Sequence, residues 1–200
     1  MGTKSGDTVR LYASQAEPVW QAILRDGVAH SREEYVKLKY GESAPVFLTA
    51  YRWYISQAVK YAPKPEGAEF PYWAFHDPYL MESGYSTRVL TLDVPKEEVV
   101  LFDMQDWNKL VQLKYMSENP ADEKRFLREL SERGITARDI MLTGFYPDLK
   151  QAIIDSWQHL FRHHNAALKG DLTGIHSLQA GLWRIRKEWV IAVDGTDFVP

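Results

Sequence analysis

Two glutamines, Gln15 and Gln179, stand beside short apolar runs where strands are expected to end or begin. A buried glutamine must find partners for its amide hydrogens and its oxygen, or it costs stability. Polar side chains at strand ends are also common ligand contacts. The two side chains could therefore meet around one polar ligand, and a structural role for each amide is the alternative.

The residues around Gln15 also predict the beginning of a helix. Ser14 and Glu17 have the spacing of a capping box, and Pro18 suits the first helical turn. This interpretation explains Ser14 and Glu17, but it leaves Gln15 without a structural role. We therefore take a contact with a ligand as the hypothesis for Gln15.

Aromatic residues and one histidine supply further candidates. The segment 49–61, TAYRWYISQAVKY, predicts a helix that is mostly core, in which Tyr51 is a polar handle and Trp53 a flat face for a base or nicotinamide ring. His76 follows the aromatic run PYWAF at an expected strand end. It could act as a general base, hydrogen-bond a ligand, or be structural.

Asp155, His159 and His163 are spaced four residues apart, so on one continuous helix they would share a face and could ligate a metal. A solvated amphipathic helix is the favoured interpretation, and we expect no metal site. The sequence also contains no GxGxxG, GxSxG or HExxH motif. Dinucleotide folds with that fingerprint, nucleophile-elbow hydrolases and zinc proteases of that type are therefore disfavoured.

Composition sets broad limits on these hypotheses. The chain has 200 residues, 45% hydrophobic and 13% aromatic, which suits one globular domain over 9–200 after a flexible segment 1–8. It contains no Cys, which excludes disulfides, thiolate metal sites and a Cys nucleophile. A net charge of −3 argues against a strongly basic nucleic-acid surface. Without a long apolar run we expect no membrane partner and a cytoplasmic location.

Hydrophobic periodicity and turn residues predict the elements that must position these side chains. We expect strands at 9–13, 70–76, 88–94, 99–103, 177–185 and 188–193, the last two forming a hairpin. We expect helices at 15–26, from Ser31, at 46–61, 105–116, 120–133 and 147–164. This order predicts an α+β domain whose mixed or split antiparallel sheet is flanked by helices.

Several of these segments together resemble an uncharacterised bacterial family, domain of unknown function family 3841. The segments are LYASQ (11–15), VWQAILRDG (19–27), AYRWYISQ (50–57), PYWAF (71–75), LTLDVPKEEVVLFD (90–103), SWQHLF (156–161) and LQAGLW (178–183). The resemblance spans nearly the whole chain. It departs in the first segment, where Gln15 is kept and the three residues before it differ from the family pattern.

The order of elements is more loosely similar to that of ADP-ribosyltransferases, which hold NAD in the cleft of a split sheet. The resemblance implies that Arg10 or Gln15 holds the cofactor, that Tyr51 stacks on nicotinamide, and that Gln179 orients the ribose. Gln15, Tyr51 and Gln179 would then be the catalytic set, and Arg10, Trp53 and His76 would bind cofactor. An amide at Gln179, where that fold often has an acid, weakens the expected charge stabilisation.

These observations lead to three hypotheses. The first is an NAD-using, ADP-ribosyltransferase-like protein that modifies nucleic acid or protein, as a bacterial toxin or defence effector with an antitoxin or immunity partner. The second is a binding module without catalysis that recognises a nucleotide or protein through an aromatic cleft. The third is a metal-dependent nuclease or hydrolase built on His159 and His163.

Overall fold

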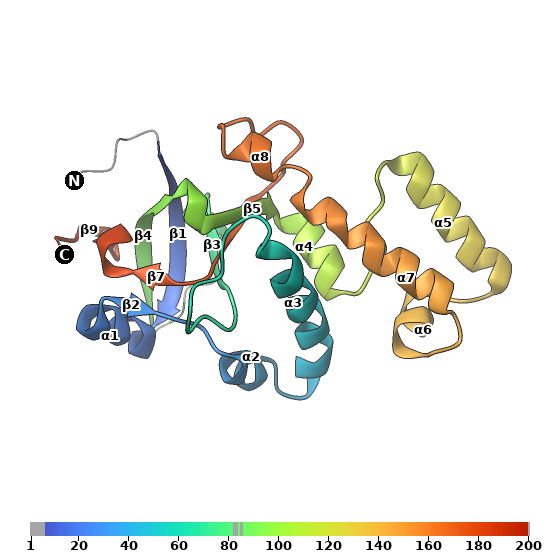
Figure 1. Cartoon of the computed structure of the whole chain (residues 1–200), viewed down its shortest axis with the longest axis horizontal. Helices are drawn as coiled ribbons and strands as arrows, with labels where there is room; N and C mark the ends of the chain where they lie inside the picture. Colours follow the sequence, from blue (N-terminus) through green and yellow to red (C-terminus); the bar gives the residue numbers. More distant parts are fainter. Residues whose placement is uncertain (1–6, 82–83, 85, 200) are drawn as a thin grey trace.

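A seven-stranded antiparallel sheet forms the centre of the computed structural model, which describes residues 7–81, 84 and 86–199 (Figure 1). In spatial order its strands are β5 (Val99–Asp103), β6 (Leu178–Leu182), β3 (Tyr72–Phe75), β1 (Thr8–Ala16), β4 (Thr87–Pro95), β8 (Val190–Val193) and β9 (Thr196–Asp197). A two-stranded ribbon pairs β2 (Val28–Ala29) with β7 (Ile185–Arg186). The fold is therefore mixed helix and strand, as the order of elements predicts.

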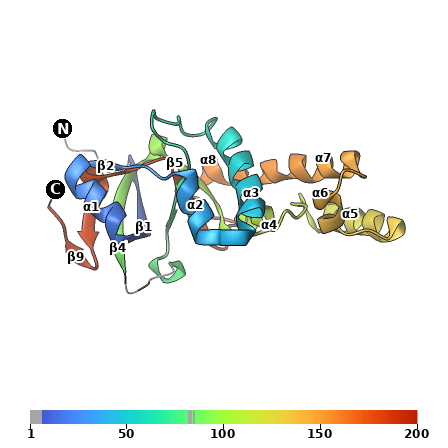
Figure 2. The same ribbon diagram turned by 90° about the horizontal axis from the view of Figure 1, so that it is seen from below.

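Helices cover the sheet and continue past its β5 edge (Figures 1 and 2). The α-helices are α1 (Glu17–Asp26), α2 (Glu33–Tyr40), α3 (Ala44–Ala58), α4 (Met104–Val111), α5 (Pro120–Arg133), α6 (Ala137–Leu142), α7 (Pro147–Ser156) and α8 (His164–Ala167). The 3-10 turns are η1 (Gly41–Ser43), η2 (Pro78–Leu80), η3 (Lys96–Glu98), η4 (Trp157–Phe161) and η5 (Lys187–Trp189). Among the described residues, the helices are too short or too polar to cross a bilayer.

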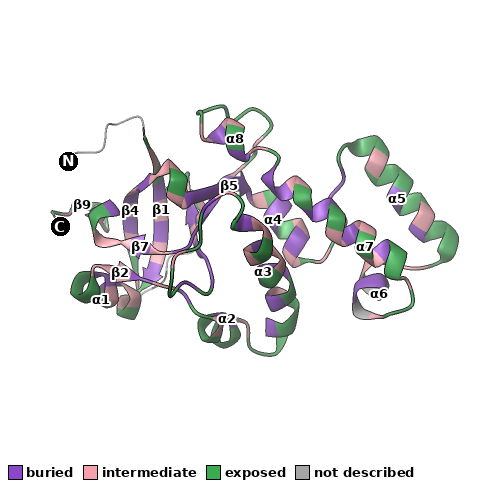
Figure 3. Ribbon diagram, in the orientation of Figure 1, coloured by how far each residue is buried: buried purple, intermediate pink, exposed green. Residues whose placement is uncertain are grey.

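The sheet has two differently covered faces because side chains alternate along each strand. We call the face with Leu11 and Ala13 the α1 face, since these residues pack in one cluster with Trp20 of α1. We call the face with Phe102 the α3 face, since Phe102 packs in a second cluster with Tyr54 of α3. Figure 3 shows buried residues concentrated along the strands and exposed residues on the outer helices.

The predicted boundaries hold where short-range signals are strong. Gly27 and Gly134 end α1 and α5 in the left-handed conformation, at φ 75° and 64°, which glycine adopts without steric cost. The Asn119 side chain accepts hydrogen bonds from two backbone amides at the beginning of α5. Of the predicted flexible segment 1–8, residues 1–6 lie outside the described residues, and Thr8 already belongs to β1.

Several predicted elements differ from the structure, among them the helix 105–116, which ends at Val111. The predicted C-terminal hairpin does not form, because β6 pairs with β3 and β5 while β8 pairs with β4. The predicted helix 147–164 ends at Ser156 and continues as the 3-10 turn η4. The predicted capping box at Ser14 is absent because β1 stays paired with β4 as far as Ala16, the residue that precedes α1 without a side-chain cap.

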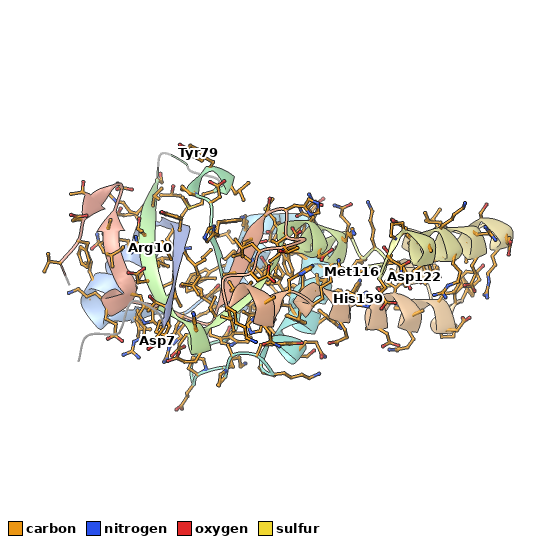
Figure 4. All side chains as sticks on the ribbon, turned by 90° about the horizontal axis from the view of Figure 1, so that it is seen from above. Asp7, Arg10, Tyr79, Met116, Asp122 and His159 are labelled. Carbon is orange, nitrogen blue, oxygen red and sulfur yellow. The ribbon has the colours of Figure 1, made fainter. Side chains whose placement is uncertain are left out.

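Helices α5, α6 and α7 extend away from the sheet (Figures 1 and 2). His159 and Met116 lie where these three helices join the rest of the chain (Figure 4). His159 Nδ1 donates a hydrogen bond to the Met116 carbonyl at 2.7 Å. A mostly apolar cavity of about 360 Å³ opens beside α5, where the rings of Tyr115 and Phe126 stack with centroids 4.0 Å apart. Its lining includes none of the six candidate site residues.

A buried histidine accepts a hydrogen bond from one backbone amide of the edge strand β5. His164 Nδ1 accepts a hydrogen bond from the Leu101 amide at 3.1 Å, which requires that nitrogen to be unprotonated. Burial lowers the pKa of His164 below its ordinary value of 6.5, and the Leu101 amide can donate only to the neutral ring. The fold therefore favours the neutral imidazole.

We expect His164 to make the fold sensitive to acid. The unfolded chain binds a proton on this ring near pH 6.5, whereas the folded chain binds it only at lower pH, so stability should fall as the pH drops below about 6.5. The His164→Gln variant keeps an acceptor for Leu101 but does not titrate. Between pH 7.5 and pH 5.5 the melting temperature of the variant should fall less than that of the wild-type protein. Equal falls in melting temperature would contradict this role of His164.

Candidate functional site

Four side chains form a row across the α3 face of the sheet. Strand register places Tyr12 opposite Phe75, Phe75 opposite Gln179, and Gln179 opposite Phe102, so the four residues share one face. Tyr12 and Phe75 are half-buried, whereas Gln179 is 4% exposed and Phe102 is buried. We call these four residues the central row. It presents two partly accessible rings beside one amide.

The sheet separates next to this row. Strands β1 and β4 pair along the whole length of β1, from Thr8 to Ala16. In contrast, within the described part of the chain β1 pairs with β3 only at Tyr12 and Phe75. The central row therefore crosses the sheet at the point where its two halves are joined.

Polar atoms without partners lie in and around the central row. Gln179 Oε1, Tyr54 Oη and Ser14 Oγ are all buried, and none has a hydrogen-bond partner among the described residues. Most buried polar groups in proteins are paired, so each such atom calls for an explanation. Ser14 lies two residues from Tyr12 and Tyr54 packs against Gly181, two residues from Gln179, so both are near the row on its own face.

Gln15 does not meet Gln179. Gln15 belongs to β1 and is paired with Arg88 of β4. It lies three residues from Tyr12, which places its side chain on the α1 face. The expectation that the two glutamines surround one ligand is therefore wrong. The sequence interpretation failed because it placed Gln15 in a helix, where the alternation that fixes its face does not apply.

Tyr51 and Trp53 also lie apart from the open part of the row. Tyr51 is buried, its hydroxyl accepts a hydrogen bond from Trp73 Nε1 at 2.6 Å, and burial raises its pKa well above the ordinary value. Trp53 packs against Trp157 and Phe161, with ring centroids 5.5 and 5.9 Å away. Buried Tyr51 therefore offers no free stacking face, and half-buried Trp53 already has Phe161 stacked against it.

Arg10 and His76 lie close to the row. Arg10 is two residues from Tyr12, hence on the α3 face, and its exposed guanidinium binds Asp93 at 2.5 and 3.1 Å (Figure 4). The hydrogen bond with Asp93 raises the pKa of Arg10. His76 is exposed directly after Phe75, and its amide donates to the Leu178 carbonyl. Of the two residues proposed to hold a cofactor, Arg10 is on the face of the row and Gln15 is not.

The family model for DUF3841, a domain of unknown function, matches residues 10–191. The chain belongs to the DUF3841 family. No curated protein and no solved structure matches it. The match covers the whole central row, and also Asp103 and His176 described below.

The DUF3841 domain holds a second polar cluster, which sequence reasoning missed. Asp103, at the end of β5, accepts a hydrogen bond from His176 Nδ1 at 3.0 Å and from the amides of His176 and Gln105 at 2.9 Å. Burial alone would raise the pKa of Asp103, but these hydrogen bonds outweigh it and lower the pKa. The sequence identifies Asp103 only as a residue before a helix, and nothing local reveals a partner 73 residues away.

A neighbouring carboxylate on α4 is paired with an arginine. Asp106 is buried, and Arg162 donates to its Oδ2 at 2.6 and 3.2 Å. Arg162 stands just beyond η4, so this ion pair ties α4 to the segment that leads into α8. We assign it a structural role in the DUF3841 domain.

The three residues weighed as possible metal ligands do not converge. Asp155 belongs to α7, while His159 is in the 3-10 turn η4 and bonds to Met116, so they do not share the face of one α-helix. Among the described residues, no group of three or more His, Cys, Asp or Glu side chains could hold a metal. These residues of the DUF3841 domain therefore do not support the hydrolase hypothesis.

Proposed function

We propose that the central row binds the nicotinamide end of NAD and that the protein is ADP-ribosyltransferase-like, with a nucleic acid or protein as acceptor. The observation that supports this proposal is the buried, unpartnered oxygen of Gln179 beside the half-buried rings of Tyr12 and Phe75. A carboxamide N–H donor that reached Gln179 Oε1 would offset its desolvation cost. Tyr12 or Phe75 would stack on the pyridine ring.

The proposal assigns new roles relative to the sequence hypothesis. Phe75 or Tyr12 takes the stacking role first given to Tyr51, and Arg10 would contact the pyrophosphate by exchanging Asp93 for a phosphate. Gln179 keeps its contact with the cofactor. Gln15 is left as a structural amide on the α1 face.

A second candidate function is binding without transfer. Glycosyl transfer from NAD builds positive charge on the ribose, which a carboxylate stabilises better than an amide. The central row carries the amide of Gln179 and no carboxylate. This composition favours a nucleotide-binding module as the alternative.

The Gln179→Leu variant should weaken NAD binding about tenfold, because it removes one hydrogen bond to a buried group. Its melting temperature should stay equal or rise, since the oxygen that it removes has no partner among the described residues. Calorimetric titration with NAD measures the affinity. Gln15→Leu is the matched control on the opposite face, and equal losses in both variants would contradict the proposed site.

Incubation with radiolabelled NAD distinguishes transfer from binding. Purified protein is mixed separately with cell protein, RNA and DNA, and both transferred label and released nicotinamide are scored. Label in one pool identifies the reaction and its acceptor. Tight NAD binding without nicotinamide release would identify a binding module, and absence of NAD binding would overturn both candidates.

A further inference from the structure

The β2–β7 ribbon lies beside α1 (Figure 1) and carries positively charged side chains on its outer face. The register pairs Ala29 with Ile185, and both are buried in the core cluster of the α1 face. Because side chains alternate along a strand, the residues before and after this pair point outward. His30 and Arg184 therefore stand together at the next step of the register, and Arg186 lies on the same outer face.

His30 lies in a positive electrostatic field, although the net charge of the chain is −3. The ring is half-buried, and burial lowers its pKa. The positive charges of Arg184 and Arg32 lower the pKa further, because they disfavour a protonated ring. Both charged groups that shift this pKa are thus cations. An anion placed beside the ring would be attracted to them.

Arg184 and Arg32 have donors that their present partners leave free. Nη2 of Arg184 donates to Glu98, but its buried Nε has no hydrogen-bond partner among the described residues. Most buried polar groups in proteins are paired, so this Nε calls for an explanation. Arg32 Nη1 stands 3.9 Å from the Glu34 carboxylate, and both side chains are exposed, so this ion pair contributes little. An anion could therefore bind Arg32 without the loss of a strong ion pair.

A backbone turn covers one side of the His30 ring. Gly67 has φ 81°, and a Cβ added there would lie 3.9 Å from His30 Cε1. The chain just after this turn is held to the segment that follows β2, because the Phe70 amide donates to the Ser31 carbonyl at 3.1 Å. We call His30, Arg32 and Arg184 the His30 cluster. Its side chains come from both sides of the ribbon, and the turn closes one side of it.

We propose that the His30 cluster binds a phosphate group, carried by a nucleotide or by a nucleic-acid chain. Guanidinium groups offer N–H donors in a planar arrangement that matches phosphate oxygens, and the imidazole N–H of His30 adds another donor. This inference does not depend on the proposed NAD site. The ribbon packs with the core cluster of the α1 face, whereas the central row lies on the α3 face.

Calorimetric titration with inorganic phosphate and with thymidine 5′-monophosphate tests the His30 cluster at low ionic strength, where salt screens charges least. Arg32→Gln should weaken both affinities about tenfold, since it removes a charge-assisted hydrogen bond. His30→Leu should weaken them about fivefold, because it removes the imidazole donor. The melting temperature of Arg32→Gln should equal that of the wild-type protein, since the Arg32 side chain is 61% exposed.

Arg25→Gln is the matched control. Arg25 belongs to α1, is exposed, and pairs with one carboxylate, that of Asp26. The substitution changes the net charge of the chain by as much as Arg32→Gln does, but at a place outside the His30 cluster. Its phosphate affinity should therefore equal that of the wild-type protein. A loss of affinity as large as that of Arg32→Gln would assign binding to overall charge and overturn the site.

A short thymidine oligonucleotide distinguishes the two sources of phosphate. Arg186 lies on the same outer face, two residues beyond Arg184. If the cluster binds a nucleic-acid chain, Arg186→Gln should weaken oligonucleotide binding about tenfold and leave thymidine 5′-monophosphate binding unchanged. Equal wild-type affinities for the oligonucleotide and the monophosphate would identify a nucleotide site. A wild-type protein that binds none of the three probes at millimolar concentration, or Arg32→Gln and His30→Leu variants with wild-type affinity, would overturn the proposal.

Discussion

Replacing Trp157 with alanine should lower the free energy of unfolding by about 3–5 kcal/mol, the usual cost of truncating a buried tryptophan. Trp157 is 1% exposed, and its Nε1 donates to the Lys114 carbonyl at 2.8 Å. Its ring also meets Trp53 of α3 edge to face. The side chain thus joins η4 to α3 and to the segment that precedes α5.

Urea unfolding followed by circular dichroism measures this loss. Trp157→Phe is the control, because it keeps an aromatic ring in the core but loses the bond to Lys114, and we expect a loss of about 1–2 kcal/mol. A loss below about 1 kcal/mol in Trp157→Ala would show that the surrounding residues close the cavity. The packing role assigned to Trp157 would then be wrong.

Gly181→Ala should destabilise the protein by about 2–3 kcal/mol, because the methyl group would overpack a closed core. A Cβ at Gly181 would stand 2.0 Å from Tyr54 Oη and 2.9 Å from Tyr54 Cζ, with Trp73 at 3.2 Å. Tyr54 is buried, so its ring cannot move aside into solvent. Gly181 is therefore required for the close approach of α3 to β6.

A double-mutant cycle tests this contact. Tyr54→Phe removes the hydroxyl, which is buried without a partner among the described residues, so alone it should change stability little. In the Gly181→Ala background, Tyr54→Phe should restore about 1 kcal/mol of the lost stability. The restoration should be partial, because the ring carbon Cζ stays close to the new methyl group. Strictly additive losses of stability in the two single variants and the double variant would show that a clash with the Tyr54 hydroxyl does not cause the destabilisation by Gly181→Ala.

Short-range sequence signals predicted a substantial part of the fold. The glycines at 27 and 134 and the asparagine at 119 mark helix ends correctly, because a cap depends only on residues within one turn. The alternating run at 88–94 is likewise a strand with one buried face. The capping-box prediction failed at Ser14, because Ser14 is paired with β4 as part of strand β1.

The candidate site was less predictable than the fold. Gln179 belongs to the central row as a strand residue, but the same reasoning paired it with Gln15 on the other face. A shift of one residue in register or in the beginning of a helix reverses the face of a side chain. The rings at Tyr12 and Phe75 showed no signal beyond their aromatic character.

The sequence alone determined the α+β class, the helix ends at Gly27 and Gly134, and the need for aromatic packing around α3, because composition and local backbone preference carry that information. The tertiary structure alone decided which side chains meet. Strand order places Gln179 beside Phe75, and a contact across 73 residues joins His176 to Asp103. Such contacts follow from the packing and pairing of the whole chain, which no segment encodes by itself.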